Sequence, residues 1–563
     1  MQLKSSRPKH PPSHLLGPLL HRIATLILTS LTLCLSIEAV NCEEYTKNGS
    51  VPNIVLILAD DMGFSDIGCY GGEIRTPNID RLAAGGLRFS QFYNVSLCGP
   101  TRASLMTGLY HQQVGIRGWT GTLNNRCATI PELLKQAGYS THVVGRLDMV
   151  TADDWHEPEQ IAPHVDQFFG SASIPSNLGP GSYFNLTRTS RFLCNGKPCE
   201  FPPDTTLYKT DLFTDYAVDF IEKAAAREKP FFLYAAHTAP HWPLHAKPED
   251  IAKYREMYAE KGWDQLRMDR HRRLVEAGLI DDAWGLPPRD RHASDWKKAK
   301  HKAWEAERMA VYAAQIDCLD QNIGRLLEAV RRAGVERNTL VLFLSDNGAT
   351  CGGDYTNRQL DRPGRTWRRD GTPTRFGNDP NVMPGGPDTF MSYGPAWARV
   401  SNTPFRGYKG ACHEGGIATP LIVYWPDVIK QGGRITHQPG HVIDVMATCL
   451  DVAGATYPSR FQQHNVLPLE GISLAPIFQG QQRDGHQALC WNVGGNRAVR
   501  MGNWKLVATK GKSWELYDLE TDRTEMNNLA DARPDRVGRM SETYENWAKR
   551  VGIAPKRGTK QAR

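Results

Sequence analysis

Residues 97 to 108 read Leu97-Cys98-Gly99-Pro100-Thr101-Arg102-Ala103-Ser104-Leu105-Met106-Thr107-Gly108. The stretch contains the pattern Cys-x-Pro-x-Arg followed by Ala-Ser-Leu-Met-Thr-Gly. Taken singly, Cys98 would most often be a buried, unmodified thiol, because free cysteine behaves as a small apolar residue. Arg102 could be a charge on a helix surface. What this stretch does therefore depends on the residues that the rest of the chain brings near it.

Four short apolar runs predict buried strands around this stretch. They are Ile54–Ala59, Thr141–Val144, Phe231–Ala236 and Leu340–Leu344. Continuous apolar runs that end in polar or turn residues are typical of fully buried, mostly parallel strands. Segments with helical character, Thr129–Ala137 and Met309–Ala333, lie between them. Alternating strands and helices predict an α/β domain with a large mixed, mostly parallel sheet between helices.

Polar residues follow each of these runs. Asp60-Asp61 follows the first, Gly145-Arg146 the second, His237 the third and Asp346-Asn347 the fourth. Ligands of such sheets bind beyond the carboxyl ends of the strands, so these side chains could converge on one site. The Asp and Asn residues supply oxygen ligands, which calcium or magnesium prefers. Either pair alone would more often be a solvated turn or a helix cap.

The pattern changes after about Gly471. Arg497–Met501, Trp504–Ala508 and Trp514–Leu519 alternate and are separated by turns, which predicts an antiparallel sheet, and a helix is expected over Arg536–Val551. We therefore expect a larger domain over residues 51–470, a smaller α+β subdomain over residues 471–551 and a basic tail over residues 552–563.

The first 40 residues predict a secretory signal peptide. A basic segment ending at Arg22 precedes an apolar run from Ile23 to Ile37, and small residues follow. The run is too short for a comfortable membrane span, although an uncleaved anchor is the alternative. We expect export to the periplasm or the medium, with no stable membrane span.

Composition excludes some classes of protein. The formal charge of the 563 residues is +7, of which the leader carries +3, leaving +4, and no basic tract resembles a nucleic-acid footprint. Twelve cysteines are too few for a disulfide scaffold in a chain of this length. Cys194 and Cys199 flank a turn-like loop and could form a disulfide or remain free thiols.

Extended through Gly108, the opening stretch resembles the signature of sulfatases, in the alkaline-phosphatase-like superfamily, and the chain looks most similar to bacterial arylsulfatases. Other segments resemble this family in the same order, over nearly the whole mature chain. They are Asn53–Asp61, Ile74–Asp80, Ala239–Pro243, Leu344–Gly348, Pro404–Pro420, His441–Gly454, Gly495–Val507 and Glu515–Leu519.

The resemblance implies hydrolysis of sulfate monoesters, either aryl sulfates or sulfated carbohydrates. A maturation enzyme would oxidise Cys98 to formylglycine, whose hydrated gem-diol is the nucleophile. Calcium would be bound by Asp60, Asp61, Asp346, Asn347 and the modified Cys98. The resemblance further implies that the catalytic residues beside Cys98 are Arg102, Arg146, His241 and Lys409.

The chain departs from the family pattern after Thr141. The usual lysine is Arg146, a planar fork in place of a compact ammonium. The usual histidine falls at Asp148, and His142 or His156 could substitute for it. A second departure, Trp491–Asn496, bears on substrate preference.

These departures leave alternatives open. A degenerate protein that binds sulfated glycans with little or no turnover is one. A phosphoesterase on the related fold, which would use zinc or manganese, is another. Pocket shape is expected from three loops, Ser171–Arg191, Asp264–Trp296 and Gly352–Tyr393.

Overall fold

The computed structural model describes residues 51–118, 121–148, 165–171, 182–184, 192–195, 197–199, 207–289, 293–352 and 373–553. Residues Pro52–Arg563 form one compact unit. The leader, His156 and the end of the basic tail lie outside the described residues. Within the part that is described, no helix is both long and apolar enough to cross a membrane.

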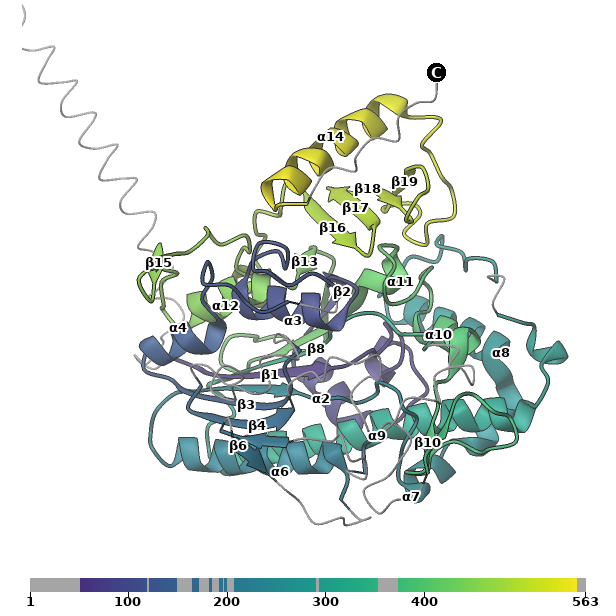
Figure 1. Cartoon of the computed structure of the whole chain (residues 1–563), viewed down its shortest axis with the longest axis horizontal. Coiled ribbons are helices and arrows are strands. Elements are labelled where there is room, and N and C mark those ends of the chain that lie inside the picture. Colours follow the sequence, from purple (N-terminus) through teal and green to yellow (C-terminus); the bar gives the residue numbers. More distant parts are fainter. Residues whose placement is uncertain are drawn as a thin grey trace, which may run out of the picture. The chain divides into compact units, whose positions relative to one another are not determined.

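A large mixed sheet forms the centre of this unit (Figure 1). Its strands, in spatial order, are β12 (Arg434–Thr436), β2 (Leu87–Tyr93), β11 (Ala418–Tyr424), β8 (Thr339–Ser345), β1 (Asn53–Ala59), β7 (Phe231–Ala236), β3 (Ser140–Arg146), β4 (Gln167–Ser171), β5 (Phe192–Cys194) and β6 (Lys197–Cys199), and β13 (Gly440–His441) pairs with β2. The four strands expected from apolar runs are adjacent and parallel, in the order β8-β1-β7-β3. The prediction of a mostly parallel sheet is therefore confirmed.

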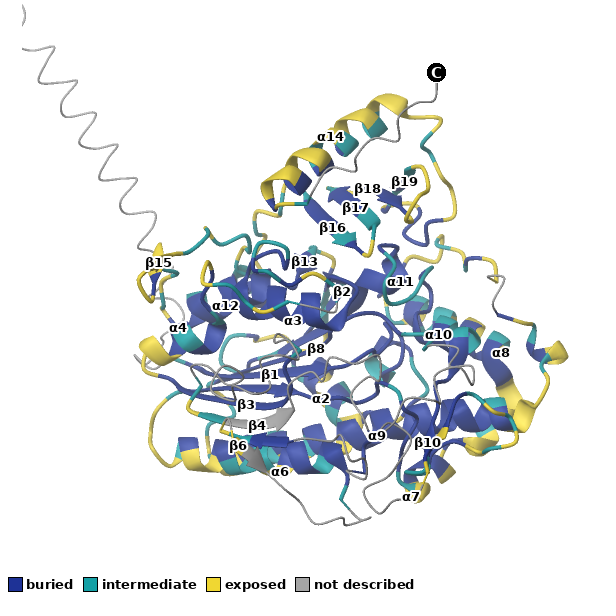
Figure 2. Cartoon of the chain, viewed as in Figure 1, coloured by how far each residue is buried: buried dark blue, intermediate teal, exposed yellow. Residues whose placement is uncertain are grey.

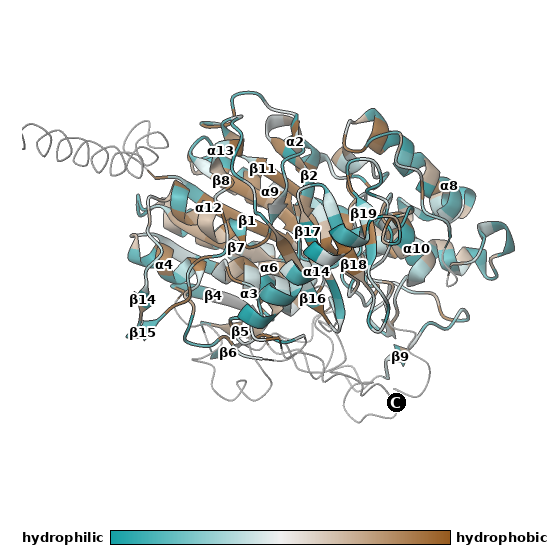
Figure 3. Ribbon diagram, turned by 90° about the horizontal axis from the view of Figure 1, so that it is seen from above, coloured by the Kyte–Doolittle hydropathy of each residue, from teal (hydrophilic) through white to brown (hydrophobic). Residues whose placement is uncertain are grey.

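Burial explains why these strands occupy the middle of the sheet. Every residue of β1, β3, β7 and β8 is buried, and β1, β3 and β8 appear as dark blue strands in Figure 2. Their apolar residues colour β1, β7 and β8 largely brown in Figure 3. Strands covered on both faces gain from apolar residues at every position, so they lack alternation.

Helices cover both faces of the sheet. In Figure 1, α3 (Cys98–Thr107), α4 (Ile130–Gln136) and α12 (Asp444–Val452) lie above the sheet, and α6 (Lys209–Ala225) and α9 (Lys302–Arg332) lie below it. Other helices of the described residues are α2 (Pro77–Gly85), α7 (Pro248–Ala252), α8 (Arg255–Glu276), α10 (Gly394–Ser401), α11 (Glu414–Ile417), α13 (Ala475–Phe478), and the 3-10 turns η1 (Gly68–Tyr70) and η3 (Trp296–Lys298).

The C-terminal residues form the expected antiparallel sheet and helix. The sheet runs β16 (Leu489–Val493), β17 (Asn496–Met501), β18 (Trp504–Ala508) and β19 (Glu515–Asp518). Helix α14 (Pro534–Arg550) buries Met540, Tyr544 and Trp547. The first strand, β16, was not expected; three of its five residues, Trp491–Val493, lie in the departure at Trp491–Asn496.

Several details differ from the sequence expectations. Strands β2 and β11 were not among the expected strands; they pair antiparallel to each other, in keeping with the expected mixed sheet. The region expected as a loop from Asp264 begins inside α8, a charged helix that sequence hydrophobicity alone does not reveal. The described residues also form two short two-stranded sheets. One pairs β9 (Arg375–Phe376) with β10 (Thr389–Phe390), and the other pairs β14 (Arg460–Phe461) with β15 (His464–Asn465). Cys194 is disulfide-bonded, so it is not a free thiol.

Buried histidines predict that acid will destabilise the fold. Burial lowers the pKa of His111, His237 and His245 to about 4 each, against about 6.5 in an unfolded chain. The unfolded state therefore binds more protons between these values, and stability falls as pH drops from 6.5 towards 4. By pH 5 we expect a loss of about 2 kcal/mol per histidine in the unfolding free energy, measured by urea denaturation.

The free energy of unfolding should not change between pH 7.5 and 8.5 on account of these groups. A His237→Asn variant, which cannot titrate there, should show a smaller decrease between pH 7 and 5 than the wild type. An unfolding free energy that stays level from pH 7 to pH 5 would contradict the prediction.

Candidate active site

An Asp-Asp pair and an Asp-Asn pair meet at the carboxyl ends of neighbouring strands. Strand β1 leads into Asp60 and Asp61, and β8 leads into Asp346 and Asn347. The two pairs lie side by side because β1 and β8 are parallel and their last residues, Ala59 and Ser345, are paired. All four side chains are buried. The Asp61 amide donates to Asp346 Oδ1 over 3.0 Å, and Asn347 Nδ2 donates to Asp61 Oδ1 over 2.7 Å. The convergence expected from the strand ends is therefore observed.

Cys98 lies at the first residue of helix α3, facing these carboxylates. Its Sγ lies 3.4 Å from Asp60 Oδ1, and Lys409 Nζ donates to the sulfur over 2.8 Å. One ligand atom from each of Asp60, Asp61, Cys98 and His241 lies within 4.8 Å of the others. Burial, together with the nearby carboxylates of Asp346 and Asp60, raises the pKa of the Cys98 thiol.

Arg102 and Lys409 place positive charge among the carboxylates. Arg102 Nη2 lies 3.3 Å from Asp60 Oδ2 and 3.2 Å from Asp346 Oδ2, and Arg102 is fully buried. Lys409 Nζ lies 2.5 Å from Asp61 Oδ1. Arg102 is thus an interior charge paired with the carboxylates that follow β1 and β8, and the alternative of a helix-surface charge is wrong.

His241 joins the site from the loop after β7. Its Nδ1 hydrogen-bonds the Trp242 carbonyl over 2.5 Å, and because a carbonyl only accepts, Nδ1 carries the proton. Nε2 lies 3.3 Å from Asp61 Oδ2. Burial lowers the imidazole pKa, so a proton on Nε2 is held less tightly than in water. His237, the strand-end residue, instead lies beside Phe213 of α6.

Arg146 and Asp148 both reach the site. Arg146 Nη1 lies 2.5 Å from Asp60 Oδ2, and Arg146 Nη2 lies 2.5 Å from Asp148 Oδ2. Only glycine fits at position 145, because its φ is 102° and a Cβ there would lie 1.9 Å from the Ala236 carbonyl oxygen. His142 does not substitute for the missing histidine, since its ring stacks on Phe220 of α6.

The donor set fits a hard divalent cation. Among the described residues, no donor hydrogen-bonds to the buried Asn347 Oδ1 or Asp61 Oδ2. Burial and the charge of Asp60 raise the pKa of Asp346 to about 7, as expected where carboxylates crowd together. Burial opposes ionisation of Asp60, but Arg146 and His241 hold its pKa below the usual range. The cluster could therefore hold a metal ion through carboxylate and amide oxygens.

One residue of the site has no sequence signal. The Tyr234 hydroxyl accepts a hydrogen bond from Arg102 Nη1 over 3.4 Å. Tyr234 lies in the middle of the apolar strand β7, where an aromatic residue is typical of a core position. Only the folded structure, through this hydrogen bond, shows that the Tyr234 hydroxyl faces the buried arginine.

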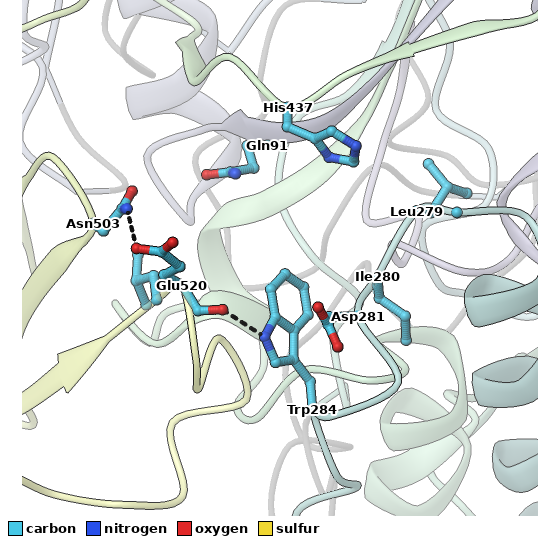
Figure 4. A pocket seen from close by; sticks show the side chains of 10 residues that line it. Gln91, Leu279, Ile280, Asp281, Trp284, His437, Asn503 and Glu520 are labelled. Atoms are coloured by element: carbon cyan, nitrogen blue, oxygen red, sulfur yellow. Dashed lines mark hydrogen bonds between the residues drawn. The ribbon is translucent and has the colours of Figure 1, made fainter.

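A separate cavity of about 470 Å³ lies elsewhere (Figure 4). Its lining includes Trp284, Asp281, His437, Asn503 and Glu520, and none of the predicted site residues is among the lining residues that the structure describes. The Trp284 indole donates to the Glu520 carbonyl over 3.0 Å. This cavity is not the carboxylate site.

The model of the sulfatase family matches residues 52–455. The chain belongs to the sulfatase family. A second model, N-sulphoglucosamine sulphohydrolase, C-terminal, matches residues 408–543 of this sulfatase. The expected resemblance is confirmed, and with it the mostly parallel α/β fold with a C-terminal antiparallel sheet.

Named relatives cover most of this sulfatase. It is 30% identical to an uncharacterized sulfatase of Schizosaccharomyces pombe, over 89% of this chain and 94% of that protein. It is 32% identical to the arylsulfatase of Klebsiella aerogenes, with 77% and 93% covered. It is 28% identical to the N-acetylgalactosamine-6-sulfatase of Mus musculus, with 84% and 75% covered.

A solved structure shows the same fold. The crystal structure of Ps i-CgsB in complex with k-i-k-neocarrahexaose is 25% identical, with a TM-score of 0.64 and with 90% of this chain and 94% of that chain covered. The sulfatase described here is a sulfuric ester hydrolase. The alternative of a degenerate glycan-binding protein is not favoured. The relatives of this chain are named as enzymes, and the side chains of Asp60, Asp61, Cys98 and His241 lie together in one cluster.

Proposed function

We propose that this sulfatase hydrolyses sulfate monoesters through a formylglycine gem-diol made from Cys98, with a calcium ion bound beside it. The observation that carries the proposal is the position of Cys98, buried at the start of α3 and facing Asp60, Asp61 and Lys409. A helix N-terminus favours the negative charge that a sulfate ester brings to that point.

The proposed ligands of the cation are the oxygens of Asp60, Asp61, Asp346 and Asn347 together with the modified Cys98. Calcium bound there would act as a Lewis acid and lower the pKa of a diol hydroxyl. With four carboxylates (Asp60, Asp61, Asp148 and Asp346) against three cationic side chains (Arg102, Arg146 and Lys409), the site alone carries a formal charge of −1. A divalent cation would make it +1, which suits an anionic substrate.

The residues of the chain supply the remaining steps. Lys409 and Arg146 bind the sulfate oxygens, and Arg102 holds the diol. One diol oxygen attacks sulfur, the S–O bond to the alcohol breaks, and His241 gives the leaving oxygen its proton. His241 Nε2, which has given up its proton, takes the proton of the second hydroxyl; the carbonyl re-forms as the C–O bond to the sulfate group breaks, and sulfate leaves. A single hydroxyl could not complete this cycle.

Sulfated saccharides and aryl sulfates are the proposed substrates. An arylsulfatase and an N-acetylgalactosamine-6-sulfatase are among the relatives, and the neighbour Ps i-CgsB was solved with an oligosaccharide. We also propose that the chain is exported to the periplasm or the medium, and that a formylglycine-generating enzyme modifies Cys98. The leader and the sulfatase signature support these two points.

The test is turnover of a chromogenic aryl sulfate. The mature chain is produced with a formylglycine-generating enzyme and calcium, and the Cys98 peptide is weighed to establish conversion. We expect many turnovers per enzyme, and none from Cys98→Ala, because the alanine lacks a nucleophilic oxygen.

Metal exchange is the control in the same assay. Chelation should abolish turnover, and calcium should restore it. Restoration by zinc or manganese, but not by calcium, would support a phosphoesterase-type site. A converted Cys98 peptide without turnover, on aryl sulfates or on sulfated sugars, would refute the catalytic proposal.

A further inference from the structure

We propose that Asp148 is a positioning residue that acts through Arg146, holding the guanidinium so that it can contact Asp60 and the bound sulfate together. The inference rests on the proposed function, because it assigns the sulfate to the site beside Cys98. It also predicts that residues 146 and 148 work as one unit.

The first observation is the bridge that Arg146 forms. One Nη atom of Arg146 lies 2.5 Å from Asp60 Oδ2 and the other lies 2.5 Å from Asp148 Oδ2. The Arg146 side chain is 9% exposed, that of Asp60 0% and that of Asp148 4%, so water screens these contacts little. A planar guanidinium can link two carboxylates at fixed separation, whereas a lysine ammonium is a single point of charge.

The second observation is the backbone around Asp148. Its φ is 53°, in the left-handed region that most residues other than glycine avoid. A Cβ on Gly99 would lie 3.0 Å from the Asp148 carbonyl oxygen, so this backbone packs against the first turn of α3. The Arg146 carbonyl accepts from Arg102 Nη1 over 2.8 Å. Both ends of this short segment are therefore attached to the site.

Two other roles for Asp148 make different predictions. If Asp148 only added negative charge, its removal would strengthen sulfate binding through simple electrostatics. If it carried a proton, its removal would change the shape of the pH profile. A positioning role predicts weaker sulfate binding, an unchanged pH profile and an effect that depends on Arg146.

The experiment is a double-mutant cycle with Arg146→Lys, Asp148→Asn and the double variant. Binding of inorganic sulfate to the calcium-loaded protein is measured by isothermal titration, and kcat and KM are measured on an aryl sulfate. We expect Asp148→Asn to weaken sulfate binding and to lower kcat by about tenfold or more, since small displacements of a binding group are costly. In the Arg146→Lys background the same change should have less than about a twofold effect.

Controls separate positioning from misfolding. Asp219→Asn, which removes an exposed ion pair with Lys223 on α6, should leave binding and turnover unchanged. Thermal unfolding should show that each variant is folded at the assay temperature. If Asp148→Asn is not folded, Asp148→Glu and Asp148→Ala are compared instead. We then expect Asp148→Glu to recover part of the sulfate binding and turnover that Asp148→Ala loses.

Tighter sulfate binding by Asp148→Asn, or equal effects in both backgrounds, would overturn the inference. Loss of one limb of the pH profile would assign Asp148 a proton-transfer role and would also overturn it. Failure of the proposed function looks different. The wild type would then show no turnover, while the sulfate-binding cycle would still report whether Asp148 acts through Arg146.

Discussion

A Cys98→Ser variant is expected to release at most one equivalent of product and then stop. A serine has one hydroxyl, so its oxygen can attack sulfur but cannot re-form a carbonyl to expel the sulfate group. The site would hold the ester tightly, because Lys409 and Arg102 lie among the carboxylates around position 98. Removing a nucleophile of this kind typically costs turnover on the order of 10⁴-fold or more.

Two measurements check this expectation. Stopped-flow detection of the phenol should show a burst without a steady state, and mass spectrometry should show one sulfuryl group on the peptide that contains residue 98. Cys69→Ser, at a half-buried cysteine outside the site, is the matched control and should keep full turnover. Sustained turnover by Cys98→Ser would show that a single hydroxyl suffices, contrary to the gem-diol mechanism.

Glu414→Gln is expected to destabilise the fold by about 3–5 kcal/mol, the cost of breaking a buried ion pair. Glu414 Oε1 accepts from Lys505 Nζ over 2.8 Å, and its Oε2 accepts from Arg523 Nε and the Tyr93 hydroxyl over 2.9 Å each. Lys505 also contacts Glu525 over 2.9 Å, and these charged side chains are 0% exposed. The substitution would leave two buried cations with one carboxylate.

The pKa of Glu414 points the same way. Burial alone would raise it, but Lys505 and Arg523 lower it to about 2. A lowered carboxyl pKa means that this group stabilises the fold above about pH 4.5, its ordinary value, and that the contribution is lost as pH falls towards 2.

Chemical denaturation at pH 7.5 measures the loss of stability. Asp219→Asn serves again as the comparison, because an exposed pair contributes less than about 1 kcal/mol. A loss below 1 kcal/mol for Glu414→Gln would mean that the neighbouring charges rearrange to satisfy one another, and the prediction would be wrong.

The central sheet was predictable because its strands are local features. Each of β1, β3, β7 and β8 is a continuous apolar run that ends in polar residues, and burial on both faces produces that pattern directly. Strand β2, LRFSQFY, mixes polar and apolar residues and gives a weaker signal. Its antiparallel pairing with β11 joins segments more than 300 positions apart, so no local pattern could reveal it.

The residues that form the candidate site were predictable for a similar reason. Cys98 and Arg102 lie within one motif, and the acidic pairs directly follow apolar strands, so short stretches identify them. Their contacts were not predictable. His237 occupies a strand end but lies beside Phe213, whereas His241, four residues later, reaches Asp61. The direction of a loop depends on what packs around it.

The sequence by itself determined the family, the central strands and the identity of the nucleophile candidate, because these depend on residue type and short spacing. Tertiary structure decided that Arg146 bridges Asp60 and Asp148 and that Glu414 meets Lys505, 91 positions away. Such contacts depend on strand order and on the packing of helices against the sheet. Buried charges are stable only where that packing brings their partners within hydrogen-bonding distance, and this condition is a property of the folded chain.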